Sequence, residues 1–295
     1  MAASRLVALA PGECEHEWMM EYACSDGLPV VPPTPGRVSA MLAVSHLPPS
    51  AVLGKCAPSY FAVTVEDAAV SAVMAGCAPA HFPVVLATLT AALTPRFNLH
   101  GNHATTMGCT PCVVVSGPLG KAAGLNGGLG CLGSGHRANA TIGRALKLVL
   151  HRVGGARLGG SESSTLGSPA KYTFCFAEND EARDALGPWK PYHVDLSGGG
   201  SGGGVGAEQE DGAVVGGQRF SALDSCVTVH PTVGFTTIVD FYTATPDALV
   251  DWLASSVVGG WGRKMPVLSS GLLVLCPEHY ELLSRKFKTR RAFQV

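Results

Sequence analysis

The stretch that decides our interpretation of the fold is Phe97-Asn-Leu-His-Gly-Asn-His-Ala-Thr-Thr-Met-Gly-Cys-Thr-Pro-Cys112, which leads directly into Val113-Val-Val-Ser-Gly-Pro118. A polar segment followed by a short apolar run is typical of a loop that enters a buried strand. A second polar segment, Gly124-Leu-Asn-Gly-Gly-Leu-Gly-Cys-Leu-Gly-Ser-Gly-His136, precedes a helical pattern. Because binding sites are often built from polar loops beside buried elements, we expect the two segments to form one pocket.

The composition limits the classes of protein to which this chain can belong. Of its 295 residues, 46% are hydrophobic and 15% are charged, which favours a folded chain with a sizeable core. The formal net charge of -1 gives no electrostatic attraction for nucleic acid. Apolar runs such as residues 82–93 are too short to cross a bilayer. We therefore expect neither nucleic acid nor a membrane as a partner.

The cysteines indicate a reducing compartment. The chain has 10 of them, and several lie inside apolar runs, among them Cys175 and Cys276. This distribution is typical of buried free thiols rather than of a disulfide framework, so we expect an intracellular, cytoplasmic protein. The first eleven residues resemble a leader only weakly, but they carry Arg and Ser and no acid before Glu13. Targeting to an organelle therefore stays open.

The alternation of helical and strand patterns predicts a mixed α/β fold, with α+β as the alternative. Helices are expected over residues 13–23, 34–44, 64–76, 79–93, 137–153 and 245–258, and again from residue 277. Strands are expected over residues 113–116, 171–177, 225–229, 235–242 and 272–275. We expect a large core domain over residues 1–196, a flexible glycine-rich insertion over 197–217, and a smaller C-terminal α/β subdomain over 218–295.

The first polar loop holds the sharpest chemical motif, Cys109-Thr-Pro-Cys112. This spacing lets two thiols meet, yet the pair precedes a strand, whereas a thioredoxin-type pair follows one. Two packed small residues are the alternative interpretation. Histidine side chains titrate near neutral pH, so His100 and His103 suit a general base or a metal ligand, although structural histidines are commoner. A mixed metal site from these four side chains stays open, but a zinc knuckle would need a second Cys-x-x-Cys pair.

The second polar loop contains Gly128-Leu-Gly-Cys-Leu-Gly133 and leads to a helix start at Arg137. Free amides and the helix dipole at such a place favour an anion, whereas a glycine-rich turn is the plainer interpretation. Asp26, before a stiff proline-rich segment, suits an acid or base, with an ordinary Asp-Gly turn as the alternative. Cys77 suits a nucleophile or a packed small residue. The residues that we expect to bind substrate are Thr105, Thr106, Asn126, Gly128, Gly130, Gly133, Arg137, Asn139, Arg144, Lys171 and Glu178.

Several stretches in this order resemble a largely uncharacterised bacterial family: residues 25–34 (SDGLPVVPPT), 72–77 (AVMAGC), 96–101 (RFNLHG), 104–106 (ATT), 137–144 (RANATIGR) and 167–179 (GSPAKYTFCFAEN). Members of that family often accompany a small protein with a (seleno)cysteine-Gly-Ser-Cys motif. The resemblance implies a thiol- or selenol-assisted reaction, such as reductive cleavage of a carbon–heteroatom bond, and a small (seleno)protein partner. It favours Cys77 and Cys175 as thiols, because many members have a His-Pro-rich stretch at residues 107–112.

These features predict an enzyme that uses thiol or histidine chemistry on a small anionic or sulfur-containing molecule. Two alternatives stay open: a metal-dependent hydrolase or lyase, and a non-catalytic subunit of a selenoprotein-type reductase complex. The sequence does not identify a cofactor and leaves a homo-oligomer open. The catalytic candidates are His100, His103, Cys77, Cys109, Cys112, Cys175 and Asp26.

Overall fold

The protein, described by a computed structural model, has a mixed α/β fold, with 44% helix and 12% strand. The structure describes residues 6–22, 25–196, 213–215, 218–220, 223–261 and 272–292. Most of the expected glycine-rich insertion lies outside these residues. The chain divides into two compact units, the first comprising residues 1–178 and 225–234 and the second residues 179–224 and 235–295. The division of the chain at residues 178/179 differs from the boundary at residue 196 that we expected.

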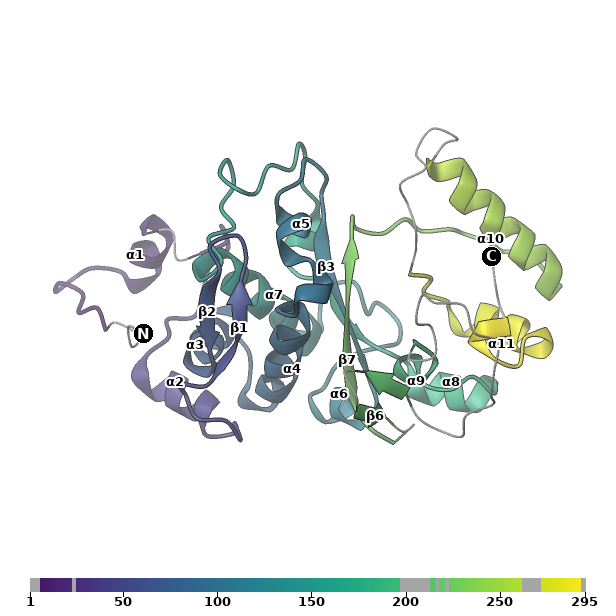
Figure 1. The fold of residues 1–295 in the computed structure, drawn as a ribbon, viewed down its shortest axis with the longest axis horizontal. Coiled ribbons are helices and arrows are strands. Elements are labelled where there is room, and N and C mark those ends of the chain that lie inside the picture. Colours follow the sequence, from purple (N-terminus) through teal and green to yellow (C-terminus); the bar gives the residue numbers. More distant parts are fainter. Residues whose placement is uncertain are drawn as a thin grey trace. The chain divides into compact units, whose positions relative to one another are not determined.

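In the first unit, helices and short strands alternate along the chain (Figure 1). Its helices are α1 (Glu15–Glu21), α2 (Pro35–Leu42), α3 (Val65–Ala75), α4 (Phe82–Ala92), α5 (Leu99–His103), α6 (Pro118–Ala122) and α7 (Arg137–Arg152), with 3-10 turns η1 (Pro79–His81), η2 (Pro95–Phe97) and η3 (Pro169–Lys171). Its strands are β1 (Val52–Cys56), β2 (Phe61–Thr64), β3 (Thr110–Ser116), β4 (Cys175–Ala177) and β7 (Cys226–Thr232).

The first unit contains a three-stranded sheet in the order β4-β3-β7. β3 is buried along its whole length, as its run of valines predicts. β4 pairs with it in parallel, with Val113 opposite Cys175, and β7 pairs in antiparallel, with Val114 opposite Thr228. β1 and β2 form a separate antiparallel hairpin that the sequence analysis did not identify. The strand that we expected after the first polar loop is β3, so that prediction is confirmed.

Helices α4 and α7 pack against this sheet, and α3 packs against both helices. The ends of α3 are set by its sequence. The Thr64 hydroxyl accepts a hydrogen bond from the amide of Asp67, whose carboxylate accepts one from the Thr64 amide, and Gly76 ends the helix at a φ of 89°. Such reciprocal caps and left-handed glycines are strong helix boundaries. The apolar helix predicted over residues 64–76 is α3, and the one predicted over residues 79–93 comprises η1 and α4. Both predictions are confirmed.

The second unit has a smaller core of its own. Its helices are α8 (Asp180–Leu186), α9 (Tyr192–Leu196), α10 (Pro246–Trp261) and α11 (Pro277–Lys286), with the 3-10 turn η4 (Arg290–Ala292), and its strands are β5 (Ala213–Val215) and β6 (Gln218–Phe220). The buried cluster of this unit consists of Trp189, Leu249, Leu253, Tyr280, Leu282 and Leu283. The predicted helices over 245–258 and from residue 277 are confirmed.

Several local predictions were wrong. Residues 235–242 and 272–275 are not strands, and the expected strand over 171–177 shortens to β4. Phe241 and Tyr242 are exposed, so their high strand propensity lacks the neighbouring strand and the packing that make it effective. The segment with His100 and His103 is the short helix α5 rather than a loop; Asn98 begins it and accepts a hydrogen bond from the amide of Gly101.

The contact between α7 and β4 provides a test of the fold. A Cβ atom on Gly143 would lie 2.9 Å from the amide nitrogen of Phe174 and 3.1 Å from Cβ of Cys175. We predict that Gly143→Ala lowers the free energy of unfolding by roughly 1–3 kcal/mol, because the helix must move away from the strand. Urea denaturation would measure this change.

Gly36→Ala is the matched control, because Gly36 lies in α2 and a Cβ there meets no atom within 4 Å. It should be neutral or raise stability by up to about 1 kcal/mol, as alanine does in an open helical position. Equal effects of the two substitutions would contradict the proposed close packing of α7 on β4.

Candidate functional site

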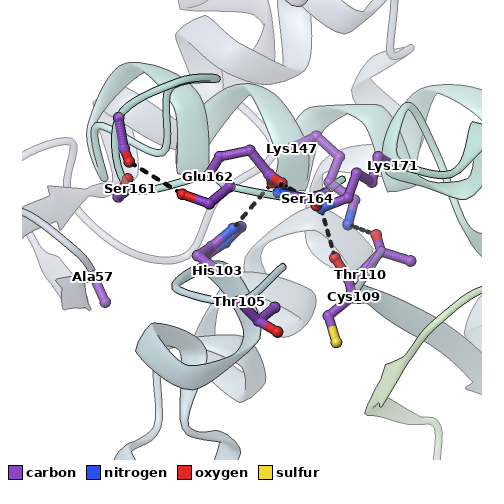
Figure 2. Close-up of polar contacts among 12 residues, drawn as sticks. Ala57, His103, Thr105, Cys109, Thr110, Lys147, Ser161, Glu162, Ser164 and Lys171 are labelled. Atoms are coloured by element: carbon purple, nitrogen blue, oxygen red, sulfur yellow. Dashed lines mark hydrogen bonds and ion pairs between the residues drawn. The ribbon is translucent and has the colours of Figure 1, made fainter. Parts of the chain in front are cut away.

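Four ionisable side chains meet in the first unit beside the start of β3. They are His103 at the end of α5, Lys147 in the middle of α7, Glu162 in the loop after α7, and Lys171 in η3. Figure 2 shows their side chains pointing toward one another, with Thr110 at the edge of the group. We call these four residues the lysine–histidine cluster. It combines two residues from the sequence prediction with two that the prediction missed.

Glu162 and Lys171 form the fully bonded half of the cluster. The Lys171 ammonium donates to both carboxylate oxygens of Glu162, at 2.7 and 2.9 Å, and to the carbonyl oxygen of Cys109 at 2.9 Å. The Ser164 hydroxyl also donates to this carboxylate. Burial opposes ionisation of Glu162, but these hydrogen bonds and the charge of Lys171 outweigh it and lower its pKa. The pair is therefore a stable ion pair at neutral pH.

Lys147 is the second lysine of the cluster. Its ammonium donates to the hydroxyl of Thr110, which in turn donates to the carbonyl oxygen of Ala170 at 3.2 Å. Burial and the positive charge of Lys171 together lower the pKa of Lys147 to about 7, against the opposing effects of Cys112 and Glu162. A lysine in such a place is a usable base or nucleophile at neutral pH, because much of it carries no proton.

His103 is buried, at 6% exposure, and neither ring nitrogen has a hydrogen-bond partner among the described residues. Its Nδ1 lies 3.9 Å from the Glu162 carboxylate, which is too far for a hydrogen bond. Burial, followed by the charge of Lys147, lowers the pKa of His103 to about 4 although Glu162 opposes the shift. The ring is therefore neutral at pH 7. A buried polar group without a partner is unusual and is a natural contact for a bound molecule.

The remaining residues of the first loop lie near the cluster but differ in setting. His100 is exposed and its Nδ1 lies 3.4 Å from the hydroxyl of Tyr60. Thr105 accepts a hydrogen bond from the amide of Met107, and the carbonyl of Thr106 accepts one from the amide of Thr165. Of the two predicted histidines, only His103 thus joins the cluster.

Cys109 and Cys112 do not form a close pair. Residues three apart along an extended chain lie roughly 10 Å from each other, beyond the reach of a disulfide, and both are free thiols. Burial raises the pKa of Cys109, and it raises the pKa of Cys112 to about 12 despite the charge of Lys147. The alternative of two packed small residues fits this geometry better than a redox pair.

The two thiols that the family resemblance favours are buried as well. Burial raises the pKa of Cys77 to about 11, although the Thr141 side chain and the charge of Arg137 oppose the shift. Cys175 lies within β4, where burial and the neighbouring thiols raise its pKa strongly. Because the thiolate is the nucleophile, neither residue is set up for attack at neutral pH.

The glycine-rich loop is organised by a pair of asparagines. Asn139 Oδ1 accepts from the amide of Asn126 at 2.8 Å, and its Nδ2 donates to the carbonyls of Asn126 and Cys131. The Asn126 side chain accepts from the amide of Gly128, and the amide of Gly133 donates to the carbonyl of Gly130. These amides are therefore engaged within the loop rather than directed at an anion.

A small pocket does lie beside this loop. Its lining residues are Cys131, Leu132, Gly133, Asn139, Ala140, Thr173, Phe174 and Cys175. Its volume of about 30 Å³ has room for one or two water molecules. We expected the two polar loops to form one pocket that binds a small molecule. The cavity beside the glycine-rich loop is too small to hold a metabolite. Glu178 is half-buried at the end of β4, where its amide donates to the carbonyl of Val115.

The arginines of α7 hold neighbouring segments in place. Arg144 forms a two-pronged ion pair with Asp26, at 2.7 and 2.8 Å, and also donates to the carbonyl of Leu28. Burial opposes ionisation of Asp26, but Arg144 and the amide of Leu28 outweigh it and lower its pKa, so the carboxylate is ionised and paired with Arg144 at neutral pH. Arg137 is exposed and donates to the carbonyl of Gly76. These contacts tie the N-terminal segment and the end of α3 to α7.

No group of three His, Cys, Asp or Glu side chains within the described residues is arranged to hold a metal ion. In the cluster, the charge of Lys171 lies beside Glu162, which does not fit a cation site. A metal-dependent enzyme that uses His100, His103 and either Cys109 or Asp26 as ligands therefore finds no support in the geometry, since Asp26 is bonded to Arg144 and His100 is exposed.

Sequence reasoning missed Lys147 and Glu162. A weak signal for the first existed, because Ala145-Leu-Lys-Leu-Val-Leu150 places a single charge within an apolar helical segment, and a buried polar residue is more informative than a buried apolar one. Glu162 lies in a serine-rich loop with no pattern of its own. Only the folded chain brings it to Lys171.

Comparison of the chain with family models, with curated proteins and with solved structures found no match. The resemblance to the bacterial family and the expected (seleno)protein partner therefore stay predictions. None of the helices in the described ranges is long and apolar enough to cross a membrane.

The lowered pKa of Lys147 predicts a cost in stability. Its value of about 7 lies below the roughly 10.4 of an unfolded lysine, so the folded state disfavours the proton. The full cost applies below pH 7 and disappears as the pH rises past 10. We predict that Lys147→Met raises the free energy of unfolding by roughly 1–3 kcal/mol at pH 6 and by little at pH 10. Denaturant unfolding at both pH values measures it.

Lys55→Met is the control, because Lys55 is exposed on β1. A surface lysine of this kind should change stability by less than about 0.5 kcal/mol at either pH. A pH-independent effect of Lys147→Met would show that its amine is not held with a lowered pKa.

Proposed function

We propose that this protein is an enzyme that breaks a carbon–heteroatom bond in a small anionic molecule by proton transfer, with Lys147 as the base. The observation that carries the proposal is the Lys147 amine, which contacts Thr110 and whose pKa is lowered to about 7 by burial and by the charge of Lys171. A general base is most effective when its pKa is close to the working pH. Ionisable groups with strongly shifted pKa values are common in active sites.

The cluster supplies each role of an elimination. Neutral Lys147 takes a proton from the carbon next to the substrate's carboxylate or carbonyl group. The amine becomes positive at the moment when negative charge develops on the substrate, and Lys171 adds a second positive charge close by. Neutral His103, with its ring nitrogens unpaired, donates a hydrogen bond to the departing heteroatom. Glu162 positions Lys171 through two hydrogen bonds.

This assignment retains the predicted anionic substrate and histidine chemistry and replaces the predicted thiol by an amine. The support for that replacement is that burial raises the pKa of each thiol candidate, Cys77, Cys109, Cys112 and Cys175. An intracellular location suits an enzyme of small metabolites and remains part of the proposal. The family resemblance suggested reductive or eliminative cleavage, and the cluster favours the eliminative form.

Hydrogen exchange in deuterium oxide tests the proposal without a known substrate. The full-length protein would be incubated with malate, serine and cysteine, three small carboxylates that carry a leaving group on the β carbon. We expect the proton next to the activating group to be lost from the NMR spectrum of at least one probe. Lys147→Met should slow this exchange about 10²–10⁴-fold, whereas Lys55→Met should leave it unchanged.

The pH dependence provides an independent readout. Because the neutral amine is the base, the exchange rate should rise with pH through about 7, the pKa of Lys147, and then level off. Exchange that survives Lys147→Met with the same pH profile would contradict the role of this lysine.

A further inference from the structure

The second unit holds a group of side chains that the proposed function does not use. Cys276 is exposed at the start of α11, and its Sγ lies 3.1 Å from Nδ1 of His279. The other ring nitrogen of His279, Nε2, lies 3.3 Å from Oδ2 of Asp240. The sequence analysis expected Cys276 to be a buried thiol in an apolar run, and that expectation was wrong. The run ends where Pro277 begins the helix, which leaves the thiol at the surface.

The fold holds these three residues in place. Leu275 directly precedes Cys276, and Ile238 lies two residues before Asp240. Both side chains pack against the core of the second unit. Tyr280, one residue after His279, is buried, and its hydroxyl donates to the carbonyl of Arg183 at 3.1 Å. These anchors fix the first turn of α11 and the approach to Asp240.

The carboxylate of Asp240 is itself oriented. Its Oδ1 accepts hydrogen bonds from the amides of Tyr242 and Thr243, at 3.1 and 3.2 Å. These bonds lower the pKa of Asp240, with the Tyr242 amide as the largest cause. The second oxygen is left to face His279. A nucleophile, a base within hydrogen-bond reach and a third group that orients the base are the signature of covalent catalysis.

The geometry suits a proton relay rather than a metal site. Cys276 and Asp240 contact opposite nitrogens of the same ring, whereas ligands of one ion must converge on a single point. Within the described residues no set of three such side chains can hold an ion. The contacts fit a ring in which Nε2 carries the proton and donates to Asp240, while Nδ1 accepts the proton of the thiol.

A base is needed because the thiol holds its proton. Partial burial of the sulfur raises the pKa of Cys276, and the carboxylate of Glu278 raises it as well through a hydrogen bond and its charge, while the amides of His279 and Glu278 lower it. Attack at neutral pH therefore requires a base that removes the proton as the bond forms. His279 is within reach of that proton.

We propose that Cys276, His279 and Asp240 form a second active site that hydrolyses neutral esters of small apolar acids. As the sulfur attacks the ester carbonyl carbon, the S–C bond forms and the thiol proton moves to His279. The C–O bond breaks and the alcohol leaves with that proton. His279 then takes a proton from water as its oxygen attacks the thioester carbon. The C–S bond breaks, the proton returns from His279 to the sulfur, and the products are the carboxylic acid and the free thiol. The cycle needs only water as a co-reactant and is independent of the lysine–histidine cluster.

The surroundings indicate the substrate class. Leu273 and Val274 precede Cys276, Phe241 and Tyr242 follow Asp240, and all four side chains are exposed, from 39% to 93%. Exposed apolar side chains on both sides of a nucleophile suit an apolar acyl group. Asp240 and Glu278 place negative charge at the thiol, which disfavours an anionic acyl donor.

The chain contains a matched control for Cys276. Cys14 is also an exposed cysteine at the cap position of a helix, and Glu15 and Glu17 lie in the first turn of that helix. No histidine or carboxylate side chain is hydrogen-bonded to its thiol among the residues that the structure describes. A difference in reactivity between the two cysteines therefore reports the His279–Asp240 pair rather than exposure or the helix end.

The test uses the full-length protein with p-nitrophenyl butyrate as the probe. Release of p-nitrophenol would be followed by absorbance, and butyryl groups would be located by peptide mass spectrometry. We expect a burst of one equivalent, with Cys276 acylated at least about tenfold faster than Cys14 and acylation lost in Cys276→Ser. His279→Ala should slow acylation of Cys276 about 100-fold, and added imidazole should restore part of it.

Two further variants separate catalysis from folding. Asp240→Asn keeps an acceptor for the amides of Tyr242 and Thr243 but not for His279, so it should lower kcat about tenfold and leave KM unchanged. Glu278→Gln changes an exposed side chain and should raise the acylation rate, because it removes a negative charge beside the thiol. Equal acylation of Cys276 and Cys14, or fast acylation that neither His279→Ala nor Glu278→Gln alters, would overturn the proposal.

Discussion

The close approach of α7 to β4 at Gly143 is the constraint on which the rest of the first unit depends. With no Cβ at this position, the helix lies close enough for the Thr173 hydroxyl to donate to the carbonyls of Asn139 and Ala140. Side chains of this one helix then reach three separate parts of the unit. Asn139 holds the glycine-rich loop, Arg144 holds the N-terminal segment, and Lys147 reaches the start of β3. The candidate site is therefore a property of the packed helix rather than of any single loop.

The parts of the fold that the sequence predicted are those decided locally. A cap such as Thr64 and a stop such as Gly76 act within a few residues, so the boundaries of α3 follow from the sequence. The strands depend on partners far away in the chain. β7 pairs with β3 across more than a hundred residues, and nothing near residue 226 identifies that partner. Residues 235–242 have the same strand propensity but no partner strand, and propensity alone does not distinguish the two cases.

The same distinction applies to the candidate site. His103 was identifiable because polar residues in a glycine-containing segment beside a strand already suggest a site. Lys171 belongs to the stretch of residues 167–179 that resembles the bacterial family. Lys147 was not identifiable, because one charge on an amphipathic helix normally faces solvent, and only its place between β3 and Lys171 gives the amine its unusual pKa. Cys276 shows the reverse error. An apolar run normally predicts burial, but a proline that starts a helix ends the run and exposes the residue before it.

Energetics distinguish the structural half of the cluster from its chemical half. Glu162 and Lys171 satisfy each other with two hydrogen bonds, and such a pair suits a structural role. Lys147 and His103 instead occupy an environment that opposes their charged forms, and the ring nitrogens of His103 have no partner among the described residues. Apolar side chains of similar size would fill the same space at lower cost. Proteins commonly accept such a cost where chemistry requires it, so the unfavourable pair, rather than the well-bonded one, is the part of this cluster to associate with a reaction.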